Sequence, residues 1–315
     1  MDRRGLLAAS LAVASSSLLA ARAKPTFETF PIWPGTPPGG AGLQVRDAFV
    51  KRAPDGPADD VAWPHVATPM LTVTPALGRP TGAAMLLIPG GSYARVALRN
   101  GGSDIARQLA ARGITAFDLR YRLPHDGWPA GPDAPLQDAQ RAMRLIRSRA
   151  ARWGLDPARV GALGASAGGH LAARLGSRSR LATYQPVDDA DGLYATPVVL
   201  GLFFPVVSVF GPTAHAQSRA ELLGPAPDEA RARALSADAD LPADMPPTYV
   251  ACAADDPVVD PANSLRLFDA LRAAKVPTEL MVFEKGGHGF PPPLPDGRPY
   301  PWLDLFLHFA RRHGL

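Results

Sequence analysis

The sequence has almost no cysteine: Cys252 is the single one among 315 residues. One thiol cannot close an intramolecular disulfide, which excludes the disulfide-framework folds. Cys252 lies in the apolar run 248–254, so we expect a small buried side chain and not a nucleophile.

A large excess of one charge is also absent, since the formal net charge is only +4. The arginines stand singly among Ala and Leu, as at Arg141, Arg144, Arg147 and Arg149. This distribution is weak evidence for binding nucleic acid or a membrane surface. We interpret these arginines as the solvated face of a helix and expect no nucleic-acid partner.

The chain shows no internal repeat, no low-complexity linker and no Cys/His cluster with the spacing of metal ligands. Asp188, Asp189 and Asp191 lack the rest of a calcium loop. We therefore expect no metal and no cofactor. The apolar share of 46% suits an ordinary globular core, and one domain over residues 43–315 is the simplest organisation.

The one longer apolar stretch, residues 5–20, is short for a membrane span and is broken by serines. Arg3-Arg4 precedes it and Ala21-Arg22-Ala23 follows it, which is the pattern of an export signal over residues 1–23. The arginine pair resembles a twin-arginine signal; general secretion and an uncleaved anchor are the alternatives. We expect an exported protein, periplasmic or secreted and bacterial, with no stable membrane insertion after cleavage. The Pro- and Gly-rich residues 24–42 suggest an irregular arm.

From there, short apolar runs alternate with amphipathic segments, an order typical of a mostly parallel sheet with helices on both faces. The expected strands are 43–49, 71–74, 84–88, 115–119, 159–163, 198–204, 248–253 and 278–283; the expected helices are 104–112, 135–153, 168–175, 262–274 and 301–312. Two aperiodic segments, 177–197 and 211–246, come after strand ends, where such sheets build their site and lid.

One strand-to-helix junction carries a chemical motif. Gly164-Ala165-Ser166-Ala167-Gly168 fits G-x-S-x-G, follows the expected strand RVGAL and opens the expected helix GGHLAARL. In a nucleophile elbow the serine sits on this sharp turn, and small neighbours let strand and helix pass closely. Ser166 is therefore the candidate nucleophile, against the alternative of a glycine-rich turn with an idle serine.

A serine hydroxyl needs a histidine base, and the base needs an acid that orients it, here in the chain order Ser, acid, His. His288 lies in a glycine frame after the last expected strand and is the candidate base. Its competitors are His170 in the elbow helix, His215, and His308 and His313 in the closing helix. His288 is favoured over them by its position after the last expected strand and by its flexible glycine frame.

The acid is expected in the loop after strand 248–253, where two carboxylates are adjacent. Asp256 stands three residues before Val259, as in a common D-x-x-V pattern, which favours it over Asp255; Asp260 is a remote third. The oxyanion donors are expected from the amide of Ala167 and from the loop at Gly91 and Ser92. A plain tight turn is the alternative for that loop.

Together, IPGGSY, FDLRYRLP, GASAGGHLA, FFPVVS, ACAADDPVVDPANS and GGHGF resemble bacterial acetyl-esterase-like α/β hydrolases, including acetylxylan esterases and xylanase-associated esterases. The resemblance spans residues 83–310. It implies the α/β-hydrolase fold and cofactor-free hydrolysis of short acyl esters, often acetyl groups on plant polysaccharide. Related esterases have His-Gly-Gly at the oxyanion loop, where this chain has Pro89 before the glycines and Ser92 after them. That difference argues against lipase-like chemistry.

The expected activity is therefore that of a serine esterase acting on small-molecule or oligosaccharide esters through an acyl-enzyme. A general short-chain carboxylesterase, a prolyl-oligopeptidase-like peptidase and a catalytically silent binding protein are the alternatives. For the substrate pocket, Tyr93, Trp302 and Tyr184 are candidates to stack on sugar rings, with ordinary packing as the alternative. His215 is either a pocket contact or a structural anchor.

Overall fold

The computed structural model of the chain describes residues 28–57, 60–224 and 228–315. The predicted export signal lies outside this range, as does the start of the predicted arm. Among the described residues, no helix combines the length and the apolar character that a membrane crossing requires.

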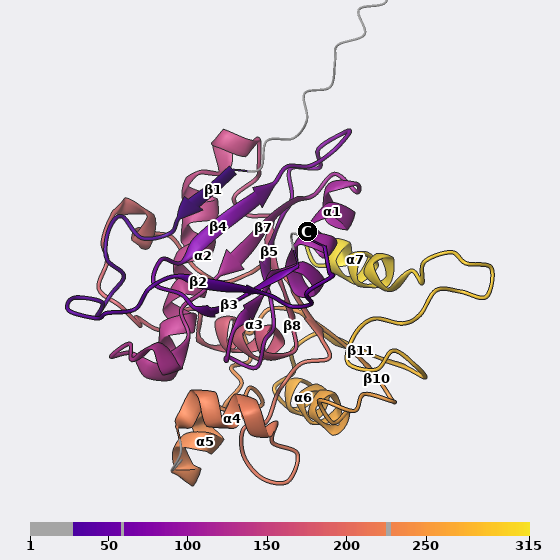
Figure 1. Ribbon diagram of the computed structural model, residues 1–315. Helices are drawn as coiled ribbons and strands as arrows, with labels where there is room; N and C mark the ends of the chain where they lie inside the picture. The colour runs from indigo at the N-terminus through magenta and orange to yellow at the C-terminus, as the bar shows by residue number, and fades with distance from the viewer. Residues whose placement is uncertain (1–27, 58–59, 225–227) are drawn as a thin grey trace, which may run out of the picture.

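An eight-stranded sheet forms the centre of the molecule (Figure 1). Its strands, in spatial order, are β1 (Glu28–Pro31), β4 (Met70–Thr74), β7 (Thr115–Arg120), β5 (Ala84–Ile88), β8 (Val160–Ala165), β9 (Leu200–Phe203), β10 (Thr248–Ala253) and β11 (Thr278–Phe283). The six strands from β7 to β11 in this order run parallel, and β4 is antiparallel to both of its neighbours. The predicted α/β-hydrolase architecture with a mostly parallel sheet is confirmed.

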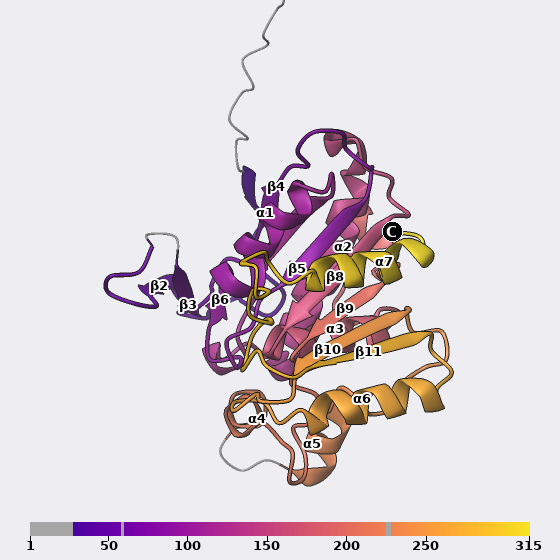
Figure 2. The ribbon, with the colours of Figure 1, turned by 90° about the vertical axis from the view of Figure 1, so that its right-hand side faces the viewer.

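Helices cover both faces of this sheet (Figure 2). Helices α1 (Asp104–Ala110) and α7 (Trp302–Arg312) share one apolar cluster, and α2 (Ala134–Ser148), α3 (Ala167–Arg178) and α6 (Ala262–Ala273) share the other. Successive residues of β5 alternate between the clusters: Leu86 and Ile88 pack on the α2–α3 side, whereas Met85 and Leu87 pack on the α1–α7 side. A strand buried on both faces needs such an unbroken apolar run.

Outside the main sheet, β2 (Ala48–Lys51), β3 (Val61–His65) and β6 (Val96–Ala97) form a small second sheet. Helices α4 (Ala216–Leu223) and α5 (Glu229–Leu235) lie within the predicted aperiodic segment 211–246. Short helical turns complete the chain: η1 (Arg99–Ser103), η2 (Pro124–Asp126), η3 (Gly131–Asp133), η4 (Ala150–Trp153) and η5 (Asp189–Gly192).

Two predictions about the N-terminal region are wrong in detail. Residues 28–31, expected to be irregular, form the edge strand β1, in which Glu28 faces Val73 of β4. The strand expected at 43–49 begins only at Ala48 and belongs to the second sheet. In both places backbone pairing with a distant strand decides the structure, and the local apolar pattern is too short to predict it.

The arginines of α2 do not form a solvated face. Arg141 is almost fully buried and forms ion pairs with Asp188 and Asp191. Arg147 is also buried and donates to the carbonyl of Thr196. The segment 177–197 supplies all these partners and so covers α2. The expectation that it helps to build the site is wrong, because none of its residues lines the cavity that contains Ser166.

Candidate active site

The elbow motif forms a sharp turn between β8 and α3. Ser166 has φ 56° and ψ −125°, a strained conformation for a residue with a side chain. A Cβ on Gly168 would lie 2.0 Å from the carbonyl oxygen of Ile88, and one on Gly164 would lie 2.2 Å from that of Gly168. Only glycine fits at either position, and this close passage holds Ser166 at the carboxyl edge of the sheet.

Ser166, His288 and Asp256 lie in a hydrogen-bonded row. His288 Nε2 is 2.8 Å from Ser166 Oγ, and His288 Nδ1 is 2.8 Å from Asp256 Oδ2. The serine follows β8, the aspartate follows β10 and the histidine follows β11. Parallel strands end at one edge of the sheet, so residues up to 122 positions apart in the sequence meet there.

Burial and hydrogen bonding compete at Asp256. Burial alone would raise the pKa of this carboxyl group, but hydrogen bonds from His288 and from the amides of Val258 and Val259 outweigh it and lower the pKa. Asp256 is therefore an ionised acceptor that holds the proton of His288 on Nδ1. Nε2 is left as the acceptor for the Ser166 hydroxyl.

The two rival carboxylates have other partners. Asp255 Oδ1 accepts from the amides of Gly286 and Gly287 at 2.9 and 2.8 Å. Asp260 Oδ1 accepts from the amide of Ala262 at 2.8 Å, at the start of α6. Asp255 thus holds the loop that carries His288 without touching the imidazole, and Asp260 accepts from the first amide of α6.

The predicted oxyanion loop lies against the serine. A Cβ on Gly90 would come within 2.9 Å of Ser166 Cβ, and one on Gly91, at φ +135°, would come within 2.0 Å of the carbonyl oxygen of Arg95. Ser92 follows with φ 59°. Ala167 is the first residue of α3, where an amide N–H has no acceptor within the helix. The three predicted donors therefore belong to the two backbone segments that flank Ser166.

Tyr93 does not reach the substrate space, contrary to expectation. It is fully buried, and its hydroxyl lies 2.8 Å from His170 Nδ1. His170 Nε2 in turn lies 2.8 Å from the carbonyl oxygen of Leu235. Burial lowers the pKa of His170 to about 3, so the neutral ring donates to Leu235 and accepts from Tyr93. These hydrogen bonds connect the oxyanion loop to α3. The sequence did not predict this role for Tyr93.

Tyr184 also lies elsewhere. Its ring packs edge-on against Trp33 at 4.8 Å between ring centroids, and its hydroxyl donates to Asp191. It belongs to the segment that covers α2 and not to the site.

A cavity of about 580 Å³ opens over Ser166 and His288. Trp302 and His215 line it, as predicted, together with Gly91 and Ser92. Its other side chains were not anticipated: Phe204, Phe290, Ile105 and Val258 are apolar, and Arg52, Arg95, Asp104, Gln108 and Gln217 are polar. Phe204, Val258 and Phe290 lie in motifs that carry the family resemblance, but no pattern in the sequence marks them as lining residues.

His215 has both of the roles that the sequence left open. It lines the cavity, and its Nδ1 accepts from the amide of Ser218, which caps α4. Burial and the nearby His288 lower the pKa of His215. A neutral imidazole therefore faces the cavity beside the row of Ser166, His288 and Asp256.

Comparison with known proteins agrees with this architecture. Residues 86–292 match a family described as having the alpha/beta hydrolase fold. The chain is 30% identical over 217 residues to an acetylxylan esterase of Xylanibacter ruminicola, covering 67% of this chain and 42% of that protein. It is 31% identical over 209 residues to endo-1,4-beta-xylanase B of Butyrivibrio fibrisolvens, covering 65% and 32%. The chain thus spans less than half the length of these relatives.

A solved structure resembles it over more of its length. The acetyl ester-xyloside bifunctional hydrolase from Caldicellulosiruptor lactoaceticus superposes with a TM-score of 0.68 at 30% identity, covering 84% of this chain and 88% of that one.

Proposed function

Because this chain belongs to the α/β-hydrolase family, we propose that it is a serine esterase that removes acetyl or other short acyl groups from sugars or xylan-type oligosaccharides. The observation that carries the proposal is the unbroken row from Asp256 through His288 to Ser166 at the base of an open cavity. The relatives named as acetylxylan esterase and acetyl ester-xyloside hydrolase support the substrate class.

The chemistry is acyl transfer in two steps. Ser166 Oγ attacks the ester carbonyl carbon while His288 Nε2 takes the hydroxyl proton, and the amides of Ala167, Gly91 and Ser92 stabilise the oxyanion. His288 then protonates the leaving alcohol. Water, deprotonated by the same imidazole, attacks the acyl-enzyme and releases the acid and free Ser166.

The cavity walls favour a small acyl group on a polar alcohol. Phe290 packs edge-on against Phe204 and is stacked on Trp302 at 3.8 Å between ring centroids. These aromatic rings offer a compact apolar wall for a short acyl chain. The polar lining residues, among them Arg52 and Gln217, offer hydrogen bonds to the hydroxyl groups of a sugar.

A chain-length series of nitrophenyl esters tests the acyl preference, with kcat/KM measured on the purified mature protein. Acetyl or propionyl should be best, and acetate should be released from acetylated xylan or acetylated xylose. A maximum of kcat/KM at octanoyl or longer, without acetate release, would contradict the carbohydrate substrate class. The protein would then be a general carboxylesterase.

Labelling with a fluorophosphonate probe separates an esterase from a silent binding protein on the same fold. The probe should label the wild-type protein and not the Ser166→Ala variant, because it reacts only with an activated serine. An unlabelled wild-type protein would contradict the proposed activity.

The place of action is part of the proposal: the enzyme works outside the cytoplasm, in the periplasm or as a secreted protein. Arg3-Arg4, the apolar stretch and Ala21-Arg22-Ala23 support it. When the full sequence is expressed in a bacterial host, the protein should be recovered from the periplasm or the medium. Its N-terminus should then be at residue 24. Retention with residues 1–23 intact would contradict export with cleavage.

A further inference from the structure

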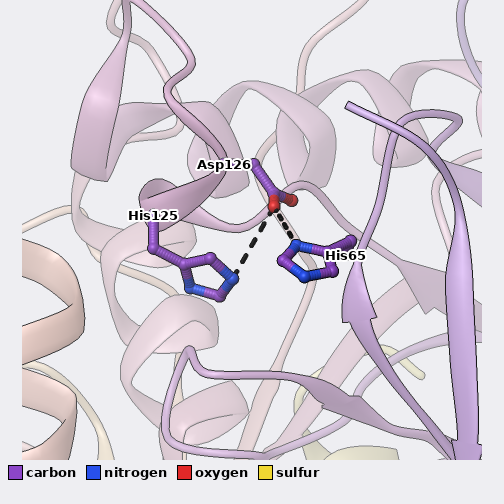
Figure 3. A group of neighbouring side chains, drawn as sticks. All are labelled: His65, His125 and Asp126. Carbon is purple, nitrogen blue, oxygen red and sulfur yellow. Dashed lines mark hydrogen bonds and ion pairs between the residues drawn. The ribbon is translucent and has the colours of Figure 1, made fainter. Parts of the chain in front are cut away.

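Two histidines and an aspartate meet where strand β3 of the second sheet ends beside the turn η2 (Figure 3). His65 ends strand β3, and His125 and Asp126 belong to the turn η2. His65 Nδ1 is 2.6 Å from Asp126 Oδ1, and His125 Nε2 is 3.6 Å from the same oxygen. Both imidazoles thus face one carboxylate oxygen, and none of the three residues lines the cavity over Ser166.

We propose that His65, His125 and Asp126 form a binding site for one Zn²⁺ ion. Two imidazole nitrogens and one carboxylate oxygen are ligands that this ion takes in proteins. One ligand atom from each residue already lies within 4.8 Å of the others. This site was not expected from the sequence, because His65 stands 61 positions before Asp126 and the three residues form no ligand motif.

Both ring nitrogens of His125 face acceptor groups. Its Nδ1 is 3.0 Å from Glu221 Oε2, and its Nε2 is 2.9 Å from the carbonyl oxygen of Pro64. Both partners are acceptors. A protonated ring would donate to both of them, whereas a neutral imidazole carries a single N–H. If that proton faces Glu221, the lone pair of Nε2 points at the oxygens of Pro64 and Asp126. A metal ion bound at Nε2 removes this conflict.

Glu221 then has the role that a carboxylate commonly has behind a metal-bound histidine. It holds the proton on Nδ1, which fixes the tautomer and directs Nε2 at the ion. Asp126 is held as well, because its Oδ2 accepts from the amide of Val66 at 3.1 Å. Two of the three ligands are therefore oriented by residues outside the site.

The remaining ligand can adjust to the ion. Zinc bonds of about 2.0–2.1 Å in tetrahedral geometry separate neighbouring ligand atoms by about 3.3 Å, so His65 Nδ1 must move away from Asp126. The side chain of His65 is 52% exposed, which permits this rotation and gives the ion a route from solvent. The Pro64 carbonyl or a water molecule would complete the coordination.

Such an ion would stabilise the elements that form one wall of the cavity over Ser166. It would join β3 to η2 directly and to α4 through Glu221. Helix α4 begins beside His215 and contains Gln217, both of which line the cavity. The site would therefore be structural and is separate from the proposed ester hydrolysis.

Calorimetric titration with Zn²⁺ tests the site on tag-free mature protein that has been stripped with a chelator. The wild-type protein should bind one equivalent, and its Tm should rise with Zn²⁺. His65→Ala should abolish this binding, and Glu221→Gln should weaken it by about 10- to 100-fold. The exposed His308 on α7 provides the matched control, since His308→Ala should bind as the wild type does.

A second variant separates this site from the active site, which has two histidines of its own, His215 and His288. His288→Ala should retain the one-equivalent site. Loss of binding in His288→Ala, equal binding by His65→Ala and the wild type, or no binding by the wild type would each overturn the proposal. Circular dichroism of His65→Ala establishes that the variant is folded.

Discussion

At the scale of single residues, neighbouring carboxylates differ in role because of what they contact. Asp256 Oδ2 meets the imidazole of His288, whereas Asp255 Oδ1 meets two backbone amides of the same loop. Loss of the charge on Asp256 would destabilise the imidazolium that forms during acyl transfer and would disturb the tautomer of His288. An asparagine at position 255 can still accept both amide hydrogen bonds through its side-chain oxygen.

We therefore expect Asp256→Asn to lower kcat by about ten-thousandfold, as in a serine protease in which the corresponding acid was replaced. Asp255→Asn should lower it far less. Steady-state kinetics with nitrophenyl acetate compare the two variants, and thermal melts control for folding. If Asp255→Asn proved the more damaging change, the acid would be assigned incorrectly.

Replacement of Ser166 by alanine removes the nucleophile without adding bulk to the elbow. The expected loss of kcat is on the order of a millionfold. Alanine keeps the Cβ of serine, so the backbone strain at φ 56° is unchanged and the variant should fold. The measurement is ester hydrolysis at high enzyme concentration, alongside circular dichroism. Retention of a tenth of the activity would rule out Ser166 as the nucleophile.

The sequence predicted the residues of the row Asp256–His288–Ser166 because each follows an apolar run that ends in a recognisable turn. Tyr93 shows where this reasoning ends. Its position beside Gly91 suggests a pocket residue, but its burial depends on His170, which is 77 positions away. Contacts of this kind are fixed by packing of the complete fold and leave no local pattern.

At the scale of elements, the same distinction separates the central strands from the periphery. The continuous apolar run of β5 predicts a buried strand without knowledge of its neighbours. The four residues of β1 become a strand only through pairing with β4. Likewise, the periodicity of α2 predicted a helix, but its covering by residues 177–197 depends on ion pairs of Arg141 with distant aspartates.

The link between the oxyanion loop and α3 gives a prediction at this scale. Tyr93→Phe removes the hydroxyl that His170 Nδ1 accepts from and leaves that nitrogen buried without a partner. The cost should be about 1–3 kcal/mol of unfolding free energy. A loosened loop should also lower kcat while KM changes little. Loss of a whole oxyanion donor costs about 100-fold in kcat, and the effect of Tyr93→Phe should be smaller than that.

Tyr249→Phe is the matched control for this variant. Tyr249 is also buried, but its hydroxyl has no hydrogen-bond partner among the described residues, so its removal should cost little stability and no activity. Urea unfolding and steady-state kinetics measure both variants. Unchanged kcat in Tyr93→Phe together with lowered stability would make the link purely structural.

At the scale of the whole molecule, one buried acid should shape the dependence of stability on pH. Asp118 lies in β7 between β4 and β5, is 5% exposed, and has no partner for Oδ1 among the described residues. Burial raises its pKa to about 8, although the charge of Arg107 acts in the opposite direction. In the unfolded chain the same group should titrate near the ordinary value of about 3.9.

Between these two pKa values the folded state binds a proton that the unfolded state does not. The contribution of Asp118 to stability is therefore complete below about pH 4 and is lost as the pH rises through about 8. Asp118→Asn keeps the size of the side chain and removes the titration. The free energy of unfolding of the variant, relative to that of the wild type, should rise by at least about 1 kcal/mol on going from pH 5 to pH 9.

Urea unfolding at the two pH values measures this difference. The control is Asp269→Asn, a substitution on the surface helix α6, which should change the free energy of unfolding little at either pH. If the difference between Asp118→Asn and the wild type were equal at both pH values, Asp118 would not be the group that couples folding to pH.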